Sequence, residues 1–349
     1  MTEGTSAPAP LPQPAQTPPR KDRTWLIVVA IVLGIVLACA ILPLGGMALL
    51  LASAGQGATT TAASGTWQEQ VISGRGNDRV VVITVSGVIG AGSSDGVFST
   101  GLSHEQLISQ IRTAAGDSRV RAVVLRVDSP GGSVVASNEL YGELLKLRER
   151  GKRLVISMGT TAASGGYYIS MAGEQVYANP DTLTGSLGVI VSLLNYDEAF
   201  SRLGLQEYVY KSGEFKDIGS PLRPPRPEEE AIWNALVDEA YQGFVDVIVE
   251  GRGMARDDVL RVADGRVYTG RQALALGLVD ELGNLDDAIE GAKALAGLDE
   301  ALVVRYRSFN SLRELLQASL ERSAQPADPL GLRAIAQPQT PRLEYRFVP

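Results

Sequence analysis

Histidine and cysteine are almost missing from this chain of 349 residues, which contains one of each, His104 and Cys39. A zinc site draws several ligands from these residue types, so zinc chemistry of that kind is excluded. A single cysteine also excludes a disulfide within the chain. A Ser-His-Asp triad would have to use His104, which has no serine in a recognisable nucleophile motif nearby. We interpret His104 as a solvated residue of a first helical turn, and we expect neither a metal nor another cofactor.

Basic residues are fewer than acidic ones, 32 against 39, and they form no basic block after residue 55. This balance argues against nucleic acid as a partner, because proteins that bind the phosphate backbone carry a basic patch. Lysine is especially scarce, which shortens the search for a general base below. The lysines are Lys21, Lys146, Lys152, Lys211, Lys216 and Lys293.

Charged side chains are absent from residues 24–68, and residues 25–54 are almost entirely apolar. A helix of about 20 apolar residues crosses a bilayer, so this segment is long enough for a kinked or tilted span. A cleaved signal peptide is the alternative, since Ala52-Ser53-Ala54 resembles a cleavage site. The apolar stretch is much longer than a signal-peptide core of about 7–15 residues, however. We therefore predict an uncleaved transmembrane anchor over residues 24–54.

The flanks of this segment predict its orientation. Arg20, Lys21 and Arg23 precede it, and the first charge after it is Glu69. The positive-inside rule then places a Pro-rich, disordered tail (1–23) in the cytoplasm and everything after a linker (55–75) outside the cell membrane, in a single-pass topology.

The region after the linker alternates between strand and helix patterns, which predicts an α/β domain with parallel strand pairing. The Val- and Ile-rich runs predict strands at Arg79–Val85, Val120–Val127, Leu154–Ser157, Gln175–Ala178, Val189–Leu194 and Gln206–Tyr210. Helical patterns with caps lie between them at Ser103–Ala115, Ser133–Arg150, Ser164–Ala172 and Asp197–Leu203.

Helical patterns dominate after Pro227, where an amphipathic helix is predicted over Glu228–Glu250. Shorter helices are expected at Asp257–Ala263, Gly270–Leu276 and Leu285–Leu295. We predict a C-terminal helical subdomain from about residue 227, within one domain of residues 76–300. We expect residues 301–349 to form a partly disordered extension. The alternating pattern of Leu343–Val348 could add as a strand to a groove or sheet edge, but we favour a frayed terminus.

Three glycine-rich segments directly follow predicted strands and carry the residues best suited to chemistry. They are 128–132 (DSPGG), 163–168 (ASGGYY) and 184–189 (TGSLGV). Ser164 enters a predicted helix, where nearby backbone N–H groups favour negative charge. Gly131 and Gly132 leave backbone N–H groups free to hold the oxyanion of an acyl-transfer reaction. The pattern indicates a nucleophilic serine that still needs a base.

A lysine is the remaining candidate for that base, since Ser-Lys pairs are an established variant of the triad. It must act in its neutral form, which requires burial or a neighbouring cation. Lys21 lies across the membrane, and three others lie at a solvated helix end or in the distant helical region. Lys211 and Lys216 remain, and composition does not decide between them.

From about Arg79 to Asp286 the chain resembles signal peptide peptidase A, a family of membrane-bound serine-lysine peptidases with a ClpP/crotonase-like fold. The matching stretches, in the order of the family, are DSPGG, AASGGYYIS, TLTGSLGVI, YKSGEFKDIGSP, GFVDVI with GRGM, and DGRVYTGRQALALGLVDELG. The resemblance implies that Ser164 is the nucleophile, Lys216 the general base and Gly131 an oxyanion donor with Gly132 beside it. It also suggests that Ser186 orients the lysine.

The function implied by this resemblance is a membrane-anchored serine endopeptidase that cleaves remnant signal peptides and other unfolded hydrophobic peptides as a homo-oligomer. One alternative is a crotonase-like enzyme acting on acyl thioesters, which the membrane anchor and the Ser-Lys pair argue against. Another is a catalytically inactive membrane scaffold, which the intact Ser164 and Lys216 argue against.

Overall fold

The computed structural model describes residues 67–90, 103–308 and 343–347. The predicted cytoplasmic tail and membrane anchor, residues 1–54, lie outside the described residues, as does most of the C-terminal extension. No helix in the described ranges is both long and apolar enough to cross a bilayer.

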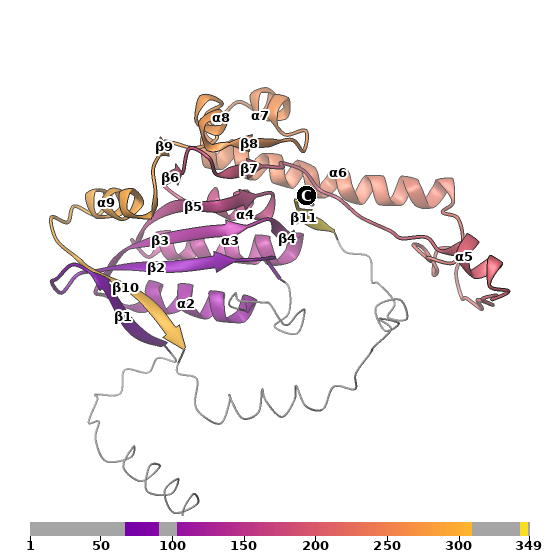
Figure 1. Ribbon diagram of the computed structural model, residues 1–349, viewed down its shortest axis with the longest axis horizontal. Helices are drawn as coiled ribbons and strands as arrows, with labels where there is room; N and C mark the ends of the chain where they lie inside the picture. The colour runs from indigo at the N-terminus through magenta and orange to yellow at the C-terminus, as the bar shows by residue number, and fades with distance from the viewer. Residues whose placement is uncertain (1–66, 91–102, 309–342, 348–349) are drawn as a thin grey trace, which may run out of the picture. The chain divides into compact units, whose positions relative to one another are not determined.

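A nine-stranded sheet forms the centre of the described part, in the order β1-β10-β2-β3-β5-β6-β9, with β7 paired to β5 and β8 to β7 (Figure 1). Its pairs are parallel except for β1 with β10 and β7 with β8. The strands are β1 (Trp67–Ser73), β2 (Arg79–Ser86), β3 (Val120–Ser129), β5 (Arg153–Ala163), β6 (Gln175–Ala178), β7 (Leu183–Gly185), β8 (Val267–Thr269), β9 (Glu281–Leu282) and β10 (Leu302–Ser308). The predicted α/β class with a mostly parallel sheet is confirmed.

Helices cover both faces of this sheet, which explains why its strands are apolar on both sides. On one face Val81 and Val123 pack into the larger core cluster, together with side chains of α2, α3, α4 and α6. Val80 and Val124, one residue along each strand, pack into the smaller cluster with α9. The helices are α2 (His104–Gly116), α3 (Val134–Glu149), α4 (Gly165–Ser170), α5 (Asp197–Arg202), α6 (Pro227–Arg252), α7 (Arg256–Val262), α8 (Gly270–Ala275) and α9 (Leu285–Leu295).

The region after residue 227 contributes to the sheet as well as to the helical layers. Strands β8, β9 and β10 all belong to the sheet, and β10 lies between β1 and β2. The predicted helical subdomain is therefore interrupted by strands, and the sheet continues beyond the expected boundary at residue 300. The reason is the pairing: Val303 and Val304 of β10 are fully buried, because the strand lies between two neighbours rather than at an edge.

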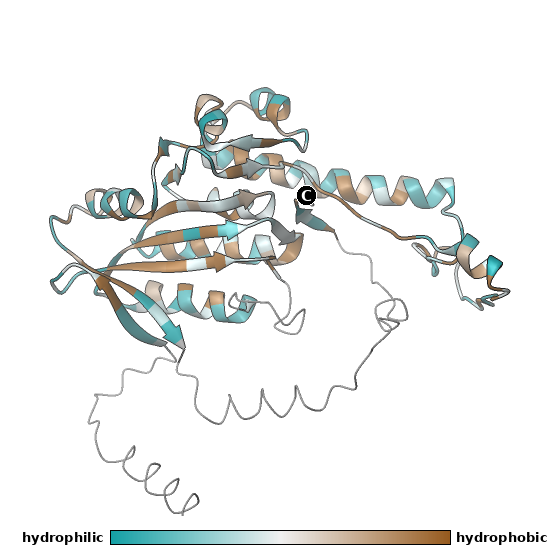
Figure 2. Cartoon of the chain, in the orientation of Figure 1, coloured by the Kyte–Doolittle hydropathy of each residue, from teal (hydrophilic) through white to brown (hydrophobic). Residues whose placement is uncertain are grey.

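Residues 191–226 form an arm that extends from the body, carries α5 and leads into the start of α6 (Figure 1). Two strands predicted here, 189–194 and 206–210, do not form; residue 190 makes only an isolated bridge, and 206–210 are irregular. The apolar residues that suggested strands are exposed instead, including Tyr210 at 96% and Leu194 at 67%. The coil from β7 toward α5 is accordingly brown in Figure 2.

Candidate active site

The three glycine-rich segments come together at the carboxyl ends of β3, β5 and β7. Ser129 at the end of β3 pairs with Ala162 of β5, and Ala163 pairs with Gly185 of β7. Parallel strands end at a common edge, and ligands of open α/β sheets bind outside that edge. This register brings the three glycine-rich segments to one edge of the sheet.

Ser164 stands at the junction between β5 and α4 in a backbone conformation that side-chain-bearing residues rarely adopt, with φ 53° and ψ −114°. Its N–H donates to the Gly185 carbonyl at 2.8 Å, and its own carbonyl accepts from the Tyr168 N–H at 2.8 Å. The side chain is 1% exposed, and among the described residues its hydroxyl has no hydrogen-bond partner. Strained residues held by their surroundings are concentrated at functional sites, and this serine fits that pattern.

Gly131 and Gly165 face one another across the site. Gly131 has φ +98°, and a Cβ atom at this residue would lie 2.7 Å from the Gly165 nitrogen. Its N–H donates to the Ser129 hydroxyl at 3.1 Å. The Gly165 N–H opens α4 and has no carbonyl acceptor within that helix. Gly165 is thus a second candidate for the oxyanion donor. It directly follows the nucleophile but was not among the residues predicted from the sequence.

Gly132 and Ser186, the two remaining residues predicted for the site, are both held by close backbone contacts. A Cβ atom on Gly132 would lie 2.1 Å from the Ile89 carbonyl oxygen, so this glycine serves a close backbone contact. Ser186 follows the Gly185 that pairs with Ala163, and it also has a positive φ, 51°. Its N–H donates to the Arg266 carbonyl at 2.7 Å. The register therefore places Ser186 beside Ser164, one residue beyond the paired strand ends.

The C-terminal residues occupy the edge of this site as a strand. Strand β4 (Gly131–Ser133) pairs antiparallel with β11 (Glu344–Arg346), as Figure 1 shows. On its other side, Glu344 exchanges two 3.1 Å backbone hydrogen bonds with Ile190. The Tyr345 carbonyl oxygen would lie 2.0 Å from a Gly131 Cβ and 3.1 Å from a Gly165 Cβ, so only glycine leaves room for it at Gly131. The favoured prediction of a frayed terminus is therefore wrong for these residues, and strand addition is observed instead.

The side chain of Tyr345 fills an aromatic pocket next to the site. It is 3% exposed, stacks on Tyr168 with ring centroids 5.0 Å apart, and meets Phe244 at 4.7 Å. Its hydroxyl donates to the Ala240 carbonyl at 3.0 Å. Burial raises the pKa of this phenol above its usual range, so the group stays neutral. The pocket accepts a large flat side chain and satisfies a single hydroxyl at its far end.

Lys211 and Lys216, which the sequence left as alternatives, differ in their surroundings. The Lys211 ammonium group donates to the Asp217 carboxylate at 2.6 Å and to the Glu214 carbonyl at 2.9 Å. The Lys211 ammonium group is thus already engaged by a carboxylate on its own turn. Lys216 is exposed on the arm. It makes no hydrogen bond to the Ser164 hydroxyl, so within one copy of the described chain the predicted pair is not in contact.

A network of ion pairs anchors the turn that carries Lys216. Arg223 donates through Nε to Asp217 at 3.0 Å and through Nη1 to Glu229 at 2.9 Å. Arg226 also binds Glu229, which is 1% exposed at the start of α6. Hydrogen bonds from Arg223, which has the larger effect, and from Arg226 lower the pKa of the Glu229 carboxyl to about 2, so this group remains charged. The turn is therefore tied to the helix rather than left loose.

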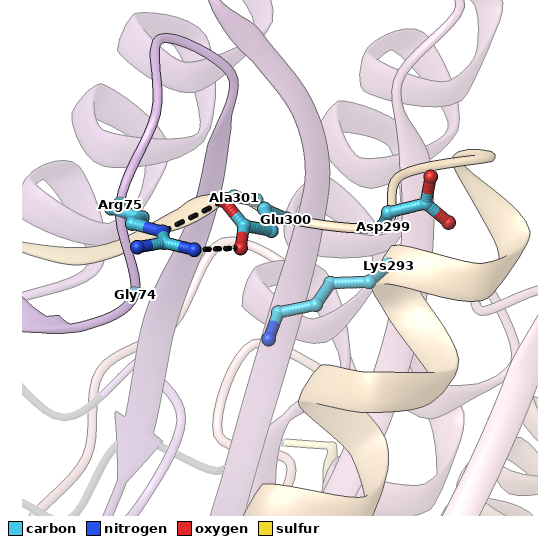
Figure 3. A pocket seen from close by; sticks show the side chains of 6 residues that line it. All are labelled: Gly74, Arg75, Lys293, Asp299, Glu300 and Ala301. Carbon is cyan, nitrogen blue, oxygen red and sulfur yellow. Dashed lines mark hydrogen bonds and ion pairs between the residues drawn. The ribbon is translucent and has the colours of Figure 1, made fainter.

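Two other features lie apart from this site. His104 begins α2 as predicted, but its side chain is only 16% exposed and binds Glu139, with Nε2 and Oε2 2.6 Å apart, so the prediction that it is solvated is wrong. A hollow of about 340 Å³ is lined mainly by polar and charged groups, and Figure 3 shows its Arg75–Glu300 ion pair. It lies where β2 and β10 begin, at the end of the sheet opposite to Ser164.

Comparisons with known proteins indicate a peptidase. Residues 146–299 match the model of peptidase family S49. The chain is 37% identical over 242 residues to "Putative signal peptide peptidase SppA" of Enterococcus faecium, covering 69% of this chain and 70% of that one. It is 35% identical to "Serine protease SPPA, chloroplastic" of Arabidopsis thaliana, covering 69% of this chain and 36% of that one. It is also 35% identical to "Protease 4" of Salmonella typhi, covering 65% and 37%.

The α/β sheet, the strained serine at a strand end and these similarities define a serine peptidase. The chain belongs to peptidase family S49, the family of signal peptide peptidase SppA.

Proposed function

We propose that the protein is a membrane-anchored endopeptidase that cleaves remnant signal peptides and other unfolded apolar peptides through Ser164 and Lys216. The observation that carries this proposal is the position of β11. Its backbone pairs with β4 and Ile190, and this pairing brings a peptide carbonyl oxygen next to Gly131 and Gly165. A substrate in the same position is extended and bound mainly through its backbone. Strand addition of this kind requires an unfolded segment.

The chemistry follows from these positions. The neutral amine of Lys216 accepts the Ser164 proton as Oγ attacks the carbonyl carbon, and the carbonyl π electrons move onto the oxygen. The Gly165 N–H donates to that oxyanion, and the Gly131 N–H joins it by leaving the Ser129 hydroxyl to which it donates here. When the oxyanion collapses, the C–N bond breaks and the Lys216 ammonium group protonates the leaving amine. Lys216, neutral again, then deprotonates a water molecule as that water attacks the acyl carbon. When the ester C–O bond breaks, the Lys216 ammonium group protonates the Ser164 oxygen and the acid product leaves.

The lysine that serves each Ser164 comes, in this proposal, from the arm of a neighbouring copy in a homo-oligomer. Lys216 is exposed on an arm that extends from the body, while the Ser164 hydroxyl is buried and lacks a partner among the described residues. Large exposed apolar side chains on the arm, including Leu203 at 72% and Tyr208 at 76%, indicate a surface that a partner covers. The resemblance to a family with a ClpP/crotonase-like fold likewise implies a homo-oligomer.

Membrane attachment in this proposal depends on residues 24–54. Their apolar length and the basic residues before them support a single span with the catalytic domain outside the cytoplasm. A peptidase held at that surface meets signal-peptide remnants as they leave the bilayer.

The full chain in detergent is expected to hydrolyse an unstructured apolar peptide and to react with a fluorophosphonate probe at one residue. Ser164 is the expected site, because its oxygen is the nucleophile at the strand edge. Peptide mapping by mass spectrometry identifies the modified residue. Labelling at another serine, or a chain that neither hydrolyses the peptide nor reacts, would refute the proposed function.

Removing residues 343–349 is expected to raise kcat/KM for short peptides by about tenfold, since β11 occupies the position that a substrate needs. Tyr345→Ala is expected to act in the same direction, because it empties the aromatic pocket. The matched variant Arg346→Ala changes a residue whose side chain is partly exposed, and should have a smaller effect. Unchanged kinetics after the deletion would show that the C-terminal strand does not compete with substrates.

A further inference from the structure

Ser137, on α3, has a buried hydroxyl that none of the interactions described so far uses. Its side chain is 0% exposed, and among the described residues its Oγ has no hydrogen-bond partner. A buried polar group without a partner loses its hydrogen bonds to water and gains none in return, so each case requires an explanation.

Other buried hydroxyls on helices in this protein follow the usual local solution. Ser170 donates to the Gly166 carbonyl at 2.7 Å, and Thr113 donates to the Ser109 carbonyl at 2.8 Å, both four residues back. The Ser133 carbonyl likewise lies four residues before Ser137, but the Ser137 hydroxyl makes no hydrogen bond to it. The Ser137 side chain is therefore oriented toward something other than its own helix.

The direction it takes is toward the reaction centre. A Cβ atom built on Gly165 would lie 2.6 Å from Ser137 Oγ, 3.1 Å from the Tyr345 carbonyl oxygen and 3.2 Å from the Gly131 Cα. The Ser137 hydroxyl and the Tyr345 carbonyl oxygen thus both lie next to the space that a side chain of Gly165 would fill. Gly165 directly follows Ser164. This also explains why Gly165 has no side chain.

We propose that Ser137 is a further catalytic residue, whose hydroxyl donates a hydrogen bond to the substrate carbonyl oxygen as it becomes an oxyanion. The bond is absent with β11 in place, and it forms when the carbon becomes tetrahedral and its oxygen shifts. An interaction made mainly in the transition state lowers the barrier without tightening substrate binding. The Gly165 N–H would then share the oxyanion with a side-chain donor. This inference rests on the proposed peptidase function.

Ser137→Ala in the full chain is expected to lower kcat by about 100-fold and to leave KM within about twofold, as for other single oxyanion donors. Its thermal midpoint should stay the same or rise, because the change removes a buried hydroxyl without a partner. A peptide aldehyde, which forms a tetrahedral adduct with the serine, should bind Ser137→Ala more weakly by a similar factor.

Tyr306→Phe is the matched control. The Tyr306 hydroxyl is also buried without a partner among the described residues, but it lies on β10, away from Ser164. It should share any gain in thermal midpoint and leave kcat unchanged.

Two results would overturn the proposal: a wild-type kcat in Ser137→Ala, or a fall in kcat accompanied by a fall in thermal midpoint, which indicates a packing role. Failure of the proposed function looks different, because the aldehyde would then not inhibit the wild-type protein either. Inhibition of wild type and Ser137→Ala with equal affinity would refute the role of Ser137 alone.

Discussion

Lys216→Ala and Ser164→Ala are each expected to reduce peptide hydrolysis by roughly three orders of magnitude or more, because the nucleophile and its base act as a unit. Neither change should unfold the protein. Lys216 is exposed, and the Ser164 hydroxyl has no partner to lose among the described residues. Steady-state hydrolysis of an unstructured peptide, with circular dichroism to check folding, measures the effect.

Lys211→Ala is the matched control for the base, five residues away on the same turn. Lys211 is engaged by Asp217, so its loss should weaken the anchoring of the turn and reduce kcat only partly. Full activity in Lys216→Ala together with none in Lys211→Ala would reverse the assignment of the base.

Mixing the two inactive variants tests where the base comes from. If Lys216 serves Ser164 of a neighbouring copy, co-expressed Ser164→Ala and Lys216→Ala chains form some sites with both residues intact. Random one-to-one assembly around a ring gives about one quarter of wild-type activity. If each chain uses its own lysine, no site is complete and activity stays at the level of the single variants.

The sequence predicted the core of this fold well because its signals are local. The Val- and Ile-rich runs of β2, β3 and β5 are buried on both faces, and the glycine-rich segments after the strands meet because parallel strands end at one edge. Ser164 could be chosen from its own neighbours in the chain.

The features that the sequence did not predict depend on contacts between distant residues. Strand β10 lies between β1 and β2, more than 200 residues away along the chain, and its short apolar run alone could not indicate a central position. The arm shows the opposite case, since its apolar residues resemble strands but find no neighbouring strand within the described chain and remain exposed. The orientation of Ser137 also requires the packing of α3 against α4, which no local pattern reports.

The choice between Lys211 and Lys216 as the general base depends on the structure as well as on the motif. Elimination left both, and the resemblance alone preferred Lys216. The ion pair of Lys211 with Asp217 adds a physical reason for that preference. The anchoring of the same turn through Arg223 and Glu229 suggests that the arm presents its lysine in a defined orientation rather than as a mobile side chain.

Gly131→Ala is expected to lower kcat/KM by about 10²–10³-fold, comparable to the loss of an oxyanion donor. The added methyl group would lie 2.0 Å from the carbonyl oxygen that β11 places at this site, and 2.7 Å from the Gly165 nitrogen. It would therefore displace the peptide backbone and crowd a proposed donor of the oxyanion hole. Since φ is +98°, some stability should also be lost, of the order of 1–2 kcal/mol.

Gly142→Ala provides the matched control for this substitution. Gly142 lies within α3, and a Cβ atom there would have no neighbour within 4 Å. Alanine should stabilise that helix by up to about 1 kcal/mol and leave kcat/KM unchanged. Peptide hydrolysis and thermal unfolding of both variants, measured below the midpoint of the weaker one, separate the two effects. A Gly131→Ala protein that is folded and as active as wild type would show that the substrate carbonyl does not lie where β11 places its own, and the proposed binding mode would be wrong.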